Sequence, residues 1–389
     1  MWKILSAALF SVPFFISGAE IIIDKNTVWK GTVEIKDKVS VRQRALLKVL
    51  PGAEIIFSAK GQLLCEGKFS AEKALFKADV PASGFSRMEF SGSLTVKNCT
   101  FKGMITEKKR YHNAFLTADG DVDIASCTFE NSSAVECVRT KEAVIKNSFF
   151  IEPVDIGLAL FHSNLAEVAG NSFRGGERTS NMLKLNSVEK CRIKQNRFFG
   201  KGVGTELYGK SVKNIICMNS YFDNTNGMTI HNGSSENLIF SCLFDGSSYC
   251  GMRVLGGEKN LVRNCVFWNC AKYGILLSKF KESKIPSASI KITNTAISSC
   301  GTGILCGDDC YSGEITYGAF WKNAKDTDGK TAKFKIEKNI QSDPLFVAPQ
   351  ESNFRPRMKN FGYEADSPLL NAGYPEGSSI GLFISLKAK

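Results

Sequence analysis

The stretch Leu261-Val-Arg-Asn-Cys-Val-Phe267, followed after a short turn by Gly274-Ile-Leu-Leu-Ser278, consists of two short alternating runs bounded by turn residues. The same order appears earlier, in Ile193-Lys-Gln-Asn-Arg-Phe198 and in Gly251-Met-Arg-Val-Leu255. Alternation over four or five residues rich in Ile, Val and Phe is strand spacing rather than helix spacing. A pattern that recurs along the chain in this way predicts a repeat architecture built of strands.

An aromatic residue marks the repeat through most of the chain, at intervals of roughly 20 to 30 residues. A repeat of this length fits a leucine-rich horseshoe or a β-solenoid, and no leucine consensus of the horseshoe type is present. The pattern therefore predicts an all-β solenoid of about ten or more coils, with parallel strands about 4.8 Å apart along the axis. The marker positions are Phe101, Phe129, Phe149, Phe173, Phe198, Phe222, Phe244, Phe267, Ile297 and Phe320.

Asparagine recurs just before the aromatic marker in many repeats. Amide side chains stacked at one position of successive coils can hydrogen-bond to their counterparts above and below, which stabilises a tight bend. We therefore expect a structural role for these asparagines and a core position for the aromatic residue that follows. The asparagines concerned are Asn98, Asn147, Asn171, Asn196, Asn219, Asn264 and Asn294.

The two ends of the chain differ from the repeats. Residues 1–19 have a positive start, an apolar stretch and small residues at 17–19, which predicts a signal peptide and an exported, secreted, periplasmic or cell-surface protein. No membrane span is expected in the mature chain. We expect an N-terminal cap and first coils over 20–70, the solenoid over 71–323, and a proline-rich capping tail over 324–389.

The net charge is +12, or +11 once Lys3 is removed with the leader. Such an excess favours anionic partners. Outside the cytoplasm these are acidic polysaccharides or envelope polymers rather than nucleic acid, although the lysines can equally serve to keep strand edges soluble. The sequence gives no sign of oligomerisation, and we expect a monomer.

Thirteen cysteines in an exported chain suggest disulfides, but their number is odd and several share one repeat position. Cys99 and Cys127 are one such pair, which predicts free cysteines stacked as small apolar core residues. Bridges between Cys306 and Cys310, or Cys250 and Cys270, stay open. No metal site is predicted, because the chain has three histidines and no Cys-x-x-Cys pair beside them.

Three segments carry a resemblance to a known family: Pro51-Gly-Ala-Glu-Ile-Ile-Phe57, the repeats over 90–323, and the tail with Ser342-Asp-Pro-Leu-Phe346 and Asp366–Gly373. Together they resemble exported bacterial right-handed parallel β-helix proteins, the architecture shared with pectate-lyase-like enzymes. The resemblance implies the right-handed fold and leaves the chemistry open, because this architecture serves lyases, hydrolases, epimerases and non-catalytic surface modules. The paired-Asp and Gly-His-Gly signature of polygalacturonases has no counterpart here. Nor does the calcium-binding Asp cluster of pectate lyases, so a calcium cofactor is possible but has no recognised ligands.

The strand that follows the repeat glycine reveals which residues face outward. We expect inward positions at Leu158, Leu160, Leu183, Leu185, Leu207, Met228, Ile230, Met252, Val254, Ile275, Leu277, Ile304 and Cys306. The residues between them form two outward columns. The first is Glu136, Ala159, Lys184, Glu206, Thr229, Arg253, Leu276 and Leu305, and the second is Val138, Phe161, Asn186, Tyr208, His231, Leu255, Ser278 and Gly307.

The middle of these columns gathers the candidate substrate-binding residues, which are Lys184, Asn186, Glu206, Tyr208, His231 and Arg253. A long regular face suits an extended polymer, with cations on sugar carboxylates and tyrosine on a pyranose ring. The main prediction is a protein that binds or processes an extracellular acidic polysaccharide.

One alternative is a polysaccharide lyase acting by β-elimination on uronic acids. Elimination needs a cation on the carboxylate and a base near the C5 proton. Lys184, Arg253, His231 and Tyr208 are the catalytic candidates. Hydrolysis needs two carboxylates about 5 to 10 Å apart, and Glu206 has no close acidic neighbour on this face, so elimination is favoured over hydrolysis. A further alternative is a non-catalytic structural or adhesive surface module, in which these residues are ordinary surface.

Overall fold

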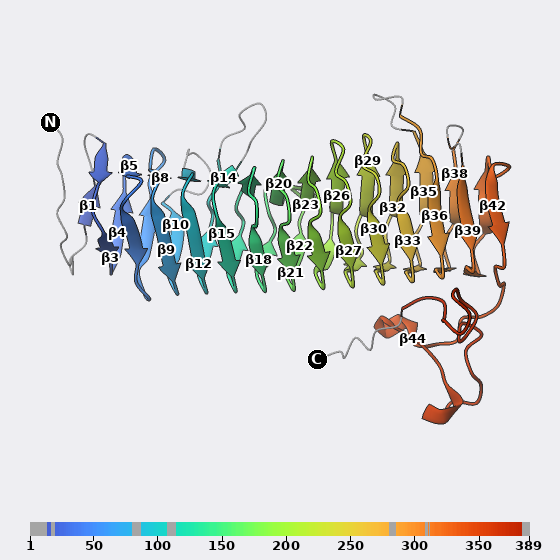
Figure 1. The fold of residues 1–389 in the computed structure, drawn as a ribbon. Helices are drawn as coiled ribbons and strands as arrows, with labels where there is room; N and C mark the ends of the chain where they lie inside the picture. Colours follow the sequence, from blue (N-terminus) through green and yellow to red (C-terminus); the bar gives the residue numbers. More distant parts are fainter. Residues whose placement is uncertain are drawn as a thin grey trace. The chain divides into compact units, whose positions relative to one another are not determined.

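The computed structural model describes residues 14–16, 20–79, 87–106, 114–279, 285–307, 310 and 312–382. The chain divides into two compact units, Met1–Val188 and Glu189–Lys389. Three strands make one coil in each unit, and equivalent strands of successive coils pair in parallel to form three sheets, here called sheets A, B and C (Figure 1). No α-helix occurs in the described ranges. The predicted parallel β-solenoid is confirmed.

The first unit begins in the blue part of Figure 1 and runs to the green. Sheet A consists of β2 (Ile21–Ile23), β5 (Lys38–Val41), β8 (Gln62–Cys65), β11 (Arg87–Phe90), β14 (Ala114–Ala118), β17 (Ala134–Val138), β20 (Asp155–Phe161) and β23 (Thr179–Asn186). Sheet B consists of β1 (Phe14–Ile16), β4 (Thr32–Ile35), β7 (Glu54–Phe57), β10 (Leu75–Ala78), β13 (Thr100–Lys102), β16 (Thr128–Glu130), β19 (Phe149–Ile151) and β22 (Ser172–Gly175). Sheet C consists of β3 (Thr27–Trp29), β6 (Leu46–Val49), β9 (Lys68–Glu72), β12 (Ser93–Lys97), β15 (Val122–Ala125), β18 (Val144–Lys146) and β21 (Glu167–Ala169).

The second unit repeats the arrangement. Sheet A consists of β26 (Val203–Tyr208), β29 (Asn226–His231), β32 (Cys250–Leu255), β35 (Tyr273–Ser278), β38 (Thr302–Cys306) and β41 (Lys325–Gly329). Sheet B consists of β25 (Arg197–Gly200), β28 (Ser220–Phe222), β31 (Leu243–Asp245), β34 (Val266–Trp268), β37 (Ala296–Ser298) and β40 (Ala319–Trp321). Sheet C consists of β24 (Arg192–Lys194), β27 (Ile215–Cys217), β30 (Leu238–Phe240), β33 (Leu261–Arg263), β36 (Ile290–Thr293), β39 (Gly313–Thr316) and β42 (Phe334–Glu337).

Aromatic rings stack inside sheet B of each unit. In the second unit Phe198, Tyr221, Phe244 and Phe267 pair in register, with ring centroids 4.5 to 4.8 Å apart and nearly parallel planes. Offset-stacked pairs of this kind add about 0.5–1.5 kcal/mol each beyond the burial of their area. The stacked column is the predicted aromatic core.

Two of the ten predicted markers are wrong by one residue. The ring that stacks between Phe129 and Phe173 is Phe150, whereas Phe149 is 51 % exposed. The ring between Phe198 and Phe244 is Tyr221, and Phe222 lies outside against Phe199. Two adjacent aromatic residues occupy each of these strands, and the period alone does not tell which of them points inward.

The predicted asparagines fall into two adjacent positions of the coil rather than one. Asn98, Asn147, Asn264 and Asn294 adopt the left-handed conformation that ends the sheet C strand, with φ between 50° and 55°. Asn171, Asn196 and Asn219 follow such a residue and point inward. Of these, Asn196 donates through Nδ2 to Oδ1 of Asn219 at 3.0 Å. The stacking prediction is thus confirmed for that pair, and Asn171 also bonds backbone groups, accepting from the N–H of Ser148 and donating to the carbonyl of Ile145.

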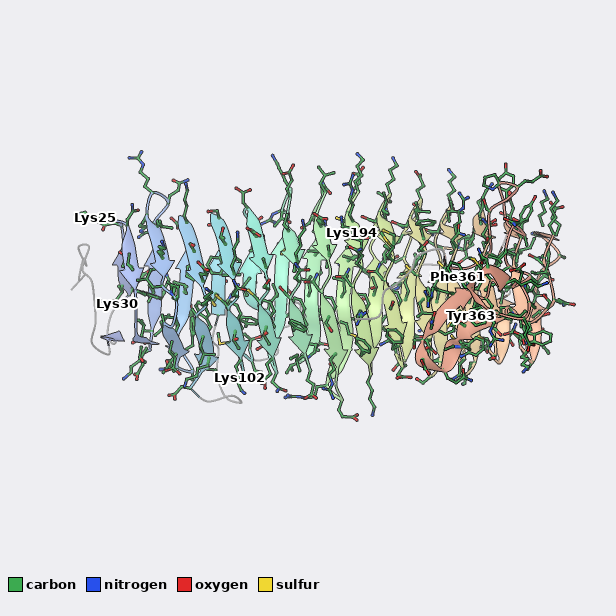
Figure 2. All side chains as sticks on the ribbon, turned by 90° about the horizontal axis from the view of Figure 1, so that it is seen from below. Lys25, Lys30, Lys102, Lys194, Phe361 and Tyr363 are labelled. Carbon is green, nitrogen blue, oxygen red and sulfur yellow. The ribbon has the colours of Figure 1, made fainter. Side chains whose placement is uncertain are left out.

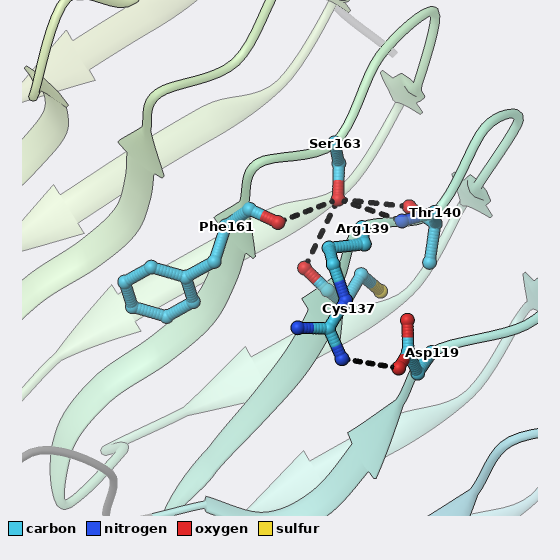
Figure 3. Close-up of polar contacts among 6 residues, drawn as sticks. All are labelled: Asp119, Cys137, Arg139, Thr140, Phe161 and Ser163. Carbon is cyan, nitrogen blue, oxygen red and sulfur yellow. Dashed lines mark hydrogen bonds and ion pairs between the residues drawn. The ribbon is translucent and has the colours of Figure 1, made fainter.

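Small polar side chains close the turns between sheets A and C. In the first unit, Ser163 Oγ accepts hydrogen bonds from the backbone N–H and the hydroxyl of Thr140, at 3.2 and 2.9 Å (Figure 3). It lies 3.1 Å from the carbonyl oxygens of both Cys137 and Phe161, to which it donates. Arg139 and Asp119 form an exposed ion pair beside this turn, at 2.6 Å. The backbone of each coil is thus satisfied by its neighbour.

All thirteen cysteines are buried and free. They serve as apolar core residues, as predicted, and neither Cys306 and Cys310 nor Cys250 and Cys270 form a bridge. The leader predicted over 1–19 lies outside the described residues except for β1, whose backbone pairs with β4.

Solenoid strands continue past residue 324, through β41 and β42, before the tail leaves the coils. The tail carries β43 (Phe346–Ala348) and β44 (Asn353–Pro356), which pair antiparallel, and the 3-10 helices η1 (Pro349–Glu351) and η2 (Lys359–Phe361). It packs against the outer face of sheet B rather than across the last coil. Buried side chains of the two sides form one cluster, made of Leu243, Val266, Ala296 and Ala319 from the sheet and Phe346, Phe354, Leu369, Ile380 and Leu382 from the tail.

Polar contacts hold the tail in place. Asn294 donates through Nδ2 to the carbonyl of Tyr374 at 2.7 Å and accepts from its N–H at 2.8 Å. Asn264 donates to the carbonyls of Ser379 and Gly381. Phe361 and Tyr363 are labelled on this segment in Figure 2, whereas Lys194 projects from the coils. Two asparagines predicted to stack on one another therefore clamp the tail instead.

Candidate functional site

The register of the two outward columns predicted on sheet A is confirmed within each unit, but six members of the columns are themselves buried: Glu136, Ala159, Thr229, His231, Leu255 and Leu276. In the second unit Glu206 pairs with Thr229, Thr229 with Arg253, and Arg253 with Leu276. In the first unit Ala159 pairs with Lys184, and Phe161 with Asn186. Each of the thirteen predicted inward residues is buried. The sequence therefore assigned the two faces of this sheet correctly.

The six candidate residues are divided between the units. Lys184 and Asn186 are outward, half-buried residues of β23 in the first unit. Glu206 and Tyr208 lie on β26, His231 on β29 and Arg253 on β32, all in the second unit. The site described below, called the sheet A face, is the outer face of β26, β29, β32 and β35. The roles predicted for all six residues stay predictions.

Glu206 and His231 form a pair with little exposure. Oε1 of Glu206 lies 2.9 Å from Nε2 of His231, and their side chains are 14 % and 9 % exposed. The other ring nitrogen, Nδ1, is buried as well. Neither nitrogen of the imidazole is therefore presented to a polymer on the surface, and His231 is placed to position its neighbours rather than to touch substrate.

Tyr208 packs on the imidazole of His231, with ring centroids 4.8 Å apart and planes tilted by 59°. It is half-buried, so one side of the phenol remains accessible. Because the Glu206–His231 pair fixes the ring beneath it, Tyr208 offers a rigid aromatic surface with a hydroxyl group at its edge. Such a group can pack on a sugar ring, or move a proton if a substrate atom approaches the oxygen.

A second group on the same face combines cations with tyrosines. The guanidinium carbon of Arg253 lies 5.6 Å from the ring centroid of Tyr249, and Nζ of Lys272 lies 5.2 Å from the same centroid. Tyr273 meets Tyr249 edge to face at 5.7 Å. Nε of Arg253 is buried and has no hydrogen-bond partner among the described residues. The group offers two positive charges held beside aromatic surface.

Sequence reasoning missed Tyr249, Lys272 and Tyr273. All three lie one or two residues before a glycine at the start of a sheet A strand, in Tyr249-Cys-Gly251 and Lys272-Tyr-Gly274. The predicted outward columns contain only residues that follow the glycine, so they leave out the residues just before it. The recurrence of tyrosine near this position in two successive coils is the signal that would have found them.

The spacing of carboxylates on this face does not suit hydrolysis. Counted toward the C-terminus, the next carboxylate among the described residues in the column of Glu206 is Asp328 on β41, which lies beyond the sheet A face. Five strand spacings separate them, or roughly 24 Å, whereas glycoside hydrolysis needs two carboxyl groups about 5 to 10 Å apart. Asp328 is also paired with Lys325 at 2.9 Å. This geometry agrees with the expectation that hydrolysis is the weaker reading.

Within the described residues, no group of three or more His, Cys, Asp or Glu side chains is arranged to hold a metal ion. The same residues contain no helix of the length and apolarity needed to span a membrane. The described residues therefore provide no recognised ligand set for a calcium ion.

Comparison with known families supports the fold assignment. Residues 83–244 match the model described as "Right handed beta helix region", and residues 176–344 match the model described as "Periplasmic copper-binding protein (NosD)". The chain is a right-handed parallel β-helix protein. No curated relative matches this β-helix protein at the level of sequence.

Solved structures share the fold at low identity. The periplasmic alginate epimerase AlgG is 13 % identical, with a TM-score of 0.59 over 85 % of this chain and 85 % of its own. The A-module of the mannuronan C-5 epimerase AlgE6 from Azotobacter vinelandii is 9 % identical, with a TM-score of 0.50 over 84 % of this chain and 91 % of its own. A tailspike protein of E. coli bacteriophage HK620, in complex with a hexasaccharide, is 9 % identical with a TM-score of 0.51 over 84 % and 70 %. The β-helix protein resembles these in fold.

Proposed function

We propose that this β-helix protein is exported to the periplasm or cell surface and binds an acidic polysaccharide along the sheet A face. One observation carries the proposal: Arg253 and Lys272 flank the ring of Tyr249, and Tyr273 meets the same ring. Glu206, a carboxylate on the same face, is engaged by His231. The face thus offers positive charge and aromatic surface together.

The chemistry of an acidic glycan matches this arrangement. Guanidinium and ammonium groups form charge-assisted hydrogen bonds with carboxylates or sulfates. Tyrosine rings pack on the C–H faces of pyranose rings while their hydroxyls stay in water. Parallel strands repeat about every 4.8 Å, so an extended polymer running along the axis meets a new coil with each sugar or so. Lys184 and Asn186 stay predicted binding residues of the first unit taken by itself.

Export and ligand class find support outside the site. The model that matches residues 176–344 is described as periplasmic, and so is the epimerase AlgG that shares the fold. Residues 1–19 carry the features of a signal peptide, and the net charge of +12 favours anionic partners. A polysaccharide is therefore proposed as the partner of a monomeric protein.

A second candidate function is processing of the polymer by removal of the C5 proton of a uronic acid. The observation that favours it is the phenol of Tyr208, held on the Glu206–His231 pair one coil from Thr229 and two from Arg253. Arg253 would neutralise the carboxylate while Tyr208 takes the proton. In a lyase, the C5 electron pair forms the C4–C5 double bond, the C4–O bond breaks, and the leaving oxygen is protonated. In an epimerase, a proton returns to the opposite face of C5.

One experiment separates the candidates. The purified protein is incubated in D2O with alginate, polygalacturonate and a neutral glucan, and binding is followed by retardation in polymer-containing gels. A binding protein is retarded by acidic polymers only and leaves them unchanged. A lyase also produces the ultraviolet absorbance of unsaturated uronates, and an epimerase places deuterium at C5. No retardation and no chemistry with any acidic polymer would overturn the proposal and leave a structural surface module.

A further inference from the structure

A hollow lies on sheet B of the second unit, away from the sheet A face. It is a cavity of about 260 Å3 between the outer face of that sheet and the C-terminal tail. Trp268, Trp321 and Lys322 line it from the coils, and Pro344, Phe346 and Arg357 line it from the tail. The tail therefore does more than cover apolar surface, because it encloses a space together with the sheet.

The two tryptophans are separated by a small residue. Trp268 pairs with Ser298, and Ser298 pairs with Trp321, so the indole-bearing positions are two coils apart. Two strand spacings are roughly 9.6 Å. The serine between them is buried, and its hydroxyl donates to the carbonyl of Trp321 at 2.8 Å. The hydroxyl therefore points to the backbone of the next coil.

The aromatic wall is supported from behind. Trp268 contacts the rings of Phe346 and Phe354, with centroids 6.0 and 5.6 Å away. Phe346 and Phe354 themselves meet edge to face at 5.3 Å. Both phenylalanines are buried in the cluster that joins tail and sheet. The indole of Trp268 is therefore held in place before any ligand arrives, which lowers the entropy cost of binding.

Two positive charges border the cavity. Nε of Arg357 donates to the carbonyl of Phe346 at 3.0 Å. This bond anchors the guanidinium through Nε and does not use its two terminal nitrogens. Lys322 is exposed, with Nζ 5.9 Å from the ring centroid of Trp321. Neither cation pairs with a carboxylate of the described residues. Asp343, the acidic residue at the rim, accepts the backbone N–H of Leu345 at 2.9 Å and so shapes its own turn.

From this combination we infer that the cavity binds a single acidic sugar residue, either a free hexuronate or the end of a uronate chain. Its volume is below the roughly 300–1,000 Å3 of pockets for drug-sized ligands, which suits one ring. Indole faces pack on sugar C–H groups, and Arg357 and Lys322 bind the carboxylate. Ser299 and Gln350 lie at the wall to meet hydroxyls. The inference does not rest on the sheet A face, since no residue is shared.

Tryptophan fluorescence tests the inference directly. The chain has four tryptophans, of which Trp29 is buried in the first unit and Trp2 lies in the predicted leader. Titration with sodium glucuronate is expected to change the emission of Trp268 and Trp321 in a saturable way. Glucose at the same concentration, with sodium chloride matching the salt, is expected to give a change at least tenfold weaker. Benzoate provides the other arm, because it carries a carboxylate and a flat ring but no hydroxyls.

Variants give the controls. Arg357→Gln and Lys322→Gln should each weaken glucuronate binding about tenfold, as loss of a charge-assisted hydrogen bond predicts. Arg355→Gln removes the same charge two residues away, where the side chain is exposed and bonds Asn353, and should leave binding unchanged. Because Lys322 is exposed, its variant folds even if Arg357→Gln disturbs the tail. No saturable change with glucuronate, equally tight binding of benzoate, or binding as tight as that of the wild type by both charge variants would overturn the inference.

Discussion

Asn214 and Asn237 occupy the same position in successive coils, and Nδ2 of the first donates to Oδ1 of the second at 2.9 Å. The same Oδ1 also accepts the backbone N–H of Asn214 at 3.0 Å. Asn237 repeats both contacts with Asn260. The amide of Asn237 thus accepts hydrogen bonds from the buried turn of the coil before it and donates to the coil after it. Repetition of these contacts forms a continuous hydrogen-bonded ladder along the solenoid axis.

Replacing Asn237 by alanine should therefore destabilise the fold strongly. The change removes the Oδ1 that accepts from the backbone N–H and from Nδ2 of Asn214, and it removes one of the two donors to the carbonyl of Ser211, which keeps the N–H of Ser235. At about 1–3 kcal/mol for a buried unsatisfied group, we expect a loss of at least 2 kcal/mol, measured by urea unfolding. Asn360→Ala, the same change at an exposed position, should cost less than about 0.5 kcal/mol. Equal effects would contradict the ladder.

Adjacent phenylalanines provide a sharp test of register. Phe150 stacks between Phe129 and Phe173 at 4.8 and 4.6 Å, whereas Phe149 beside it is 51 % exposed. Phe150→Ala should cost about 3–5 kcal/mol, as for other buried phenylalanines. Phe149→Ala should stay within about 1 kcal/mol. The free energy of unfolding of the two variants is the measurement, and a reversed order would mean that strand β19 is shifted by one residue.

The sequence could predict the fold because its information is periodic. Alternation within strands and glycines at strand starts identified both faces of sheet A, and every inward residue of that prediction is buried. Where two candidates were adjacent, as with Phe149 and Phe150, a spacing that varies from coil to coil could not choose between them. The ladder of Asn214, Asn237 and Asn260 was not predicted, because these asparagines do not come just before the aromatic marker on which the prediction was based.

The candidate site was less predictable, since side-chain contacts across coils depend on exposure and orientation. The columns placed Glu206 one coil before the coil of His231, but nothing in the sequence indicated that the imidazole would have both nitrogens buried. Asn264 and Asn294 look like the other turn asparagines in sequence. Their partners are carbonyls some 80 to 117 residues later, in a tail whose path no local pattern specifies.

The buried thiols should be unreactive in the folded protein. Burial raises the pKa of the Cys137 thiol to about 12 and that of Cys65 to about 11, and the thiolate is the reactive form. Because all thirteen cysteines are buried, almost none of the thiols of the native protein should react with Ellman's reagent within minutes at pH 8. Unfolding in guanidinium under reducing pretreatment should expose thirteen. Rapid reaction of several native thiols would contradict a closed core.

The contact between tail and sheet B should weaken as the pH rises. Burial raises the pKa of Asp245, while its hydrogen bond from Ser352 of the tail acts in the opposite direction. A carboxyl whose folded pKa is raised contributes stability below its unfolded pKa and loses it as the pH rises through the folded pKa. The stability of the wild-type protein relative to Asp245→Asn should therefore fall as the pH rises above 3.8, the ordinary pKa of the carboxyl. A difference that is flat, or that rises, would contradict this direction.

Binding of an acidic polymer to the sheet A face should depend on Arg253 and on salt. Arg253→Gln removes a half-buried charge held beside Tyr249 and should weaken retardation by alginate or polygalacturonate about tenfold, as expected for one charge-assisted contact of about 1.5–3 kcal/mol. Arg197→Gln removes the same charge from β25, an exposed position on sheet B, and should change binding little. Raising sodium chloride to 1 M shortens the Debye length to about 3 Å and should weaken the wild type more than the Arg253 variant. If both variants bind equally well, the polymer does not lie on this face, and binding that is insensitive to salt would remove the electrostatic basis of the proposal.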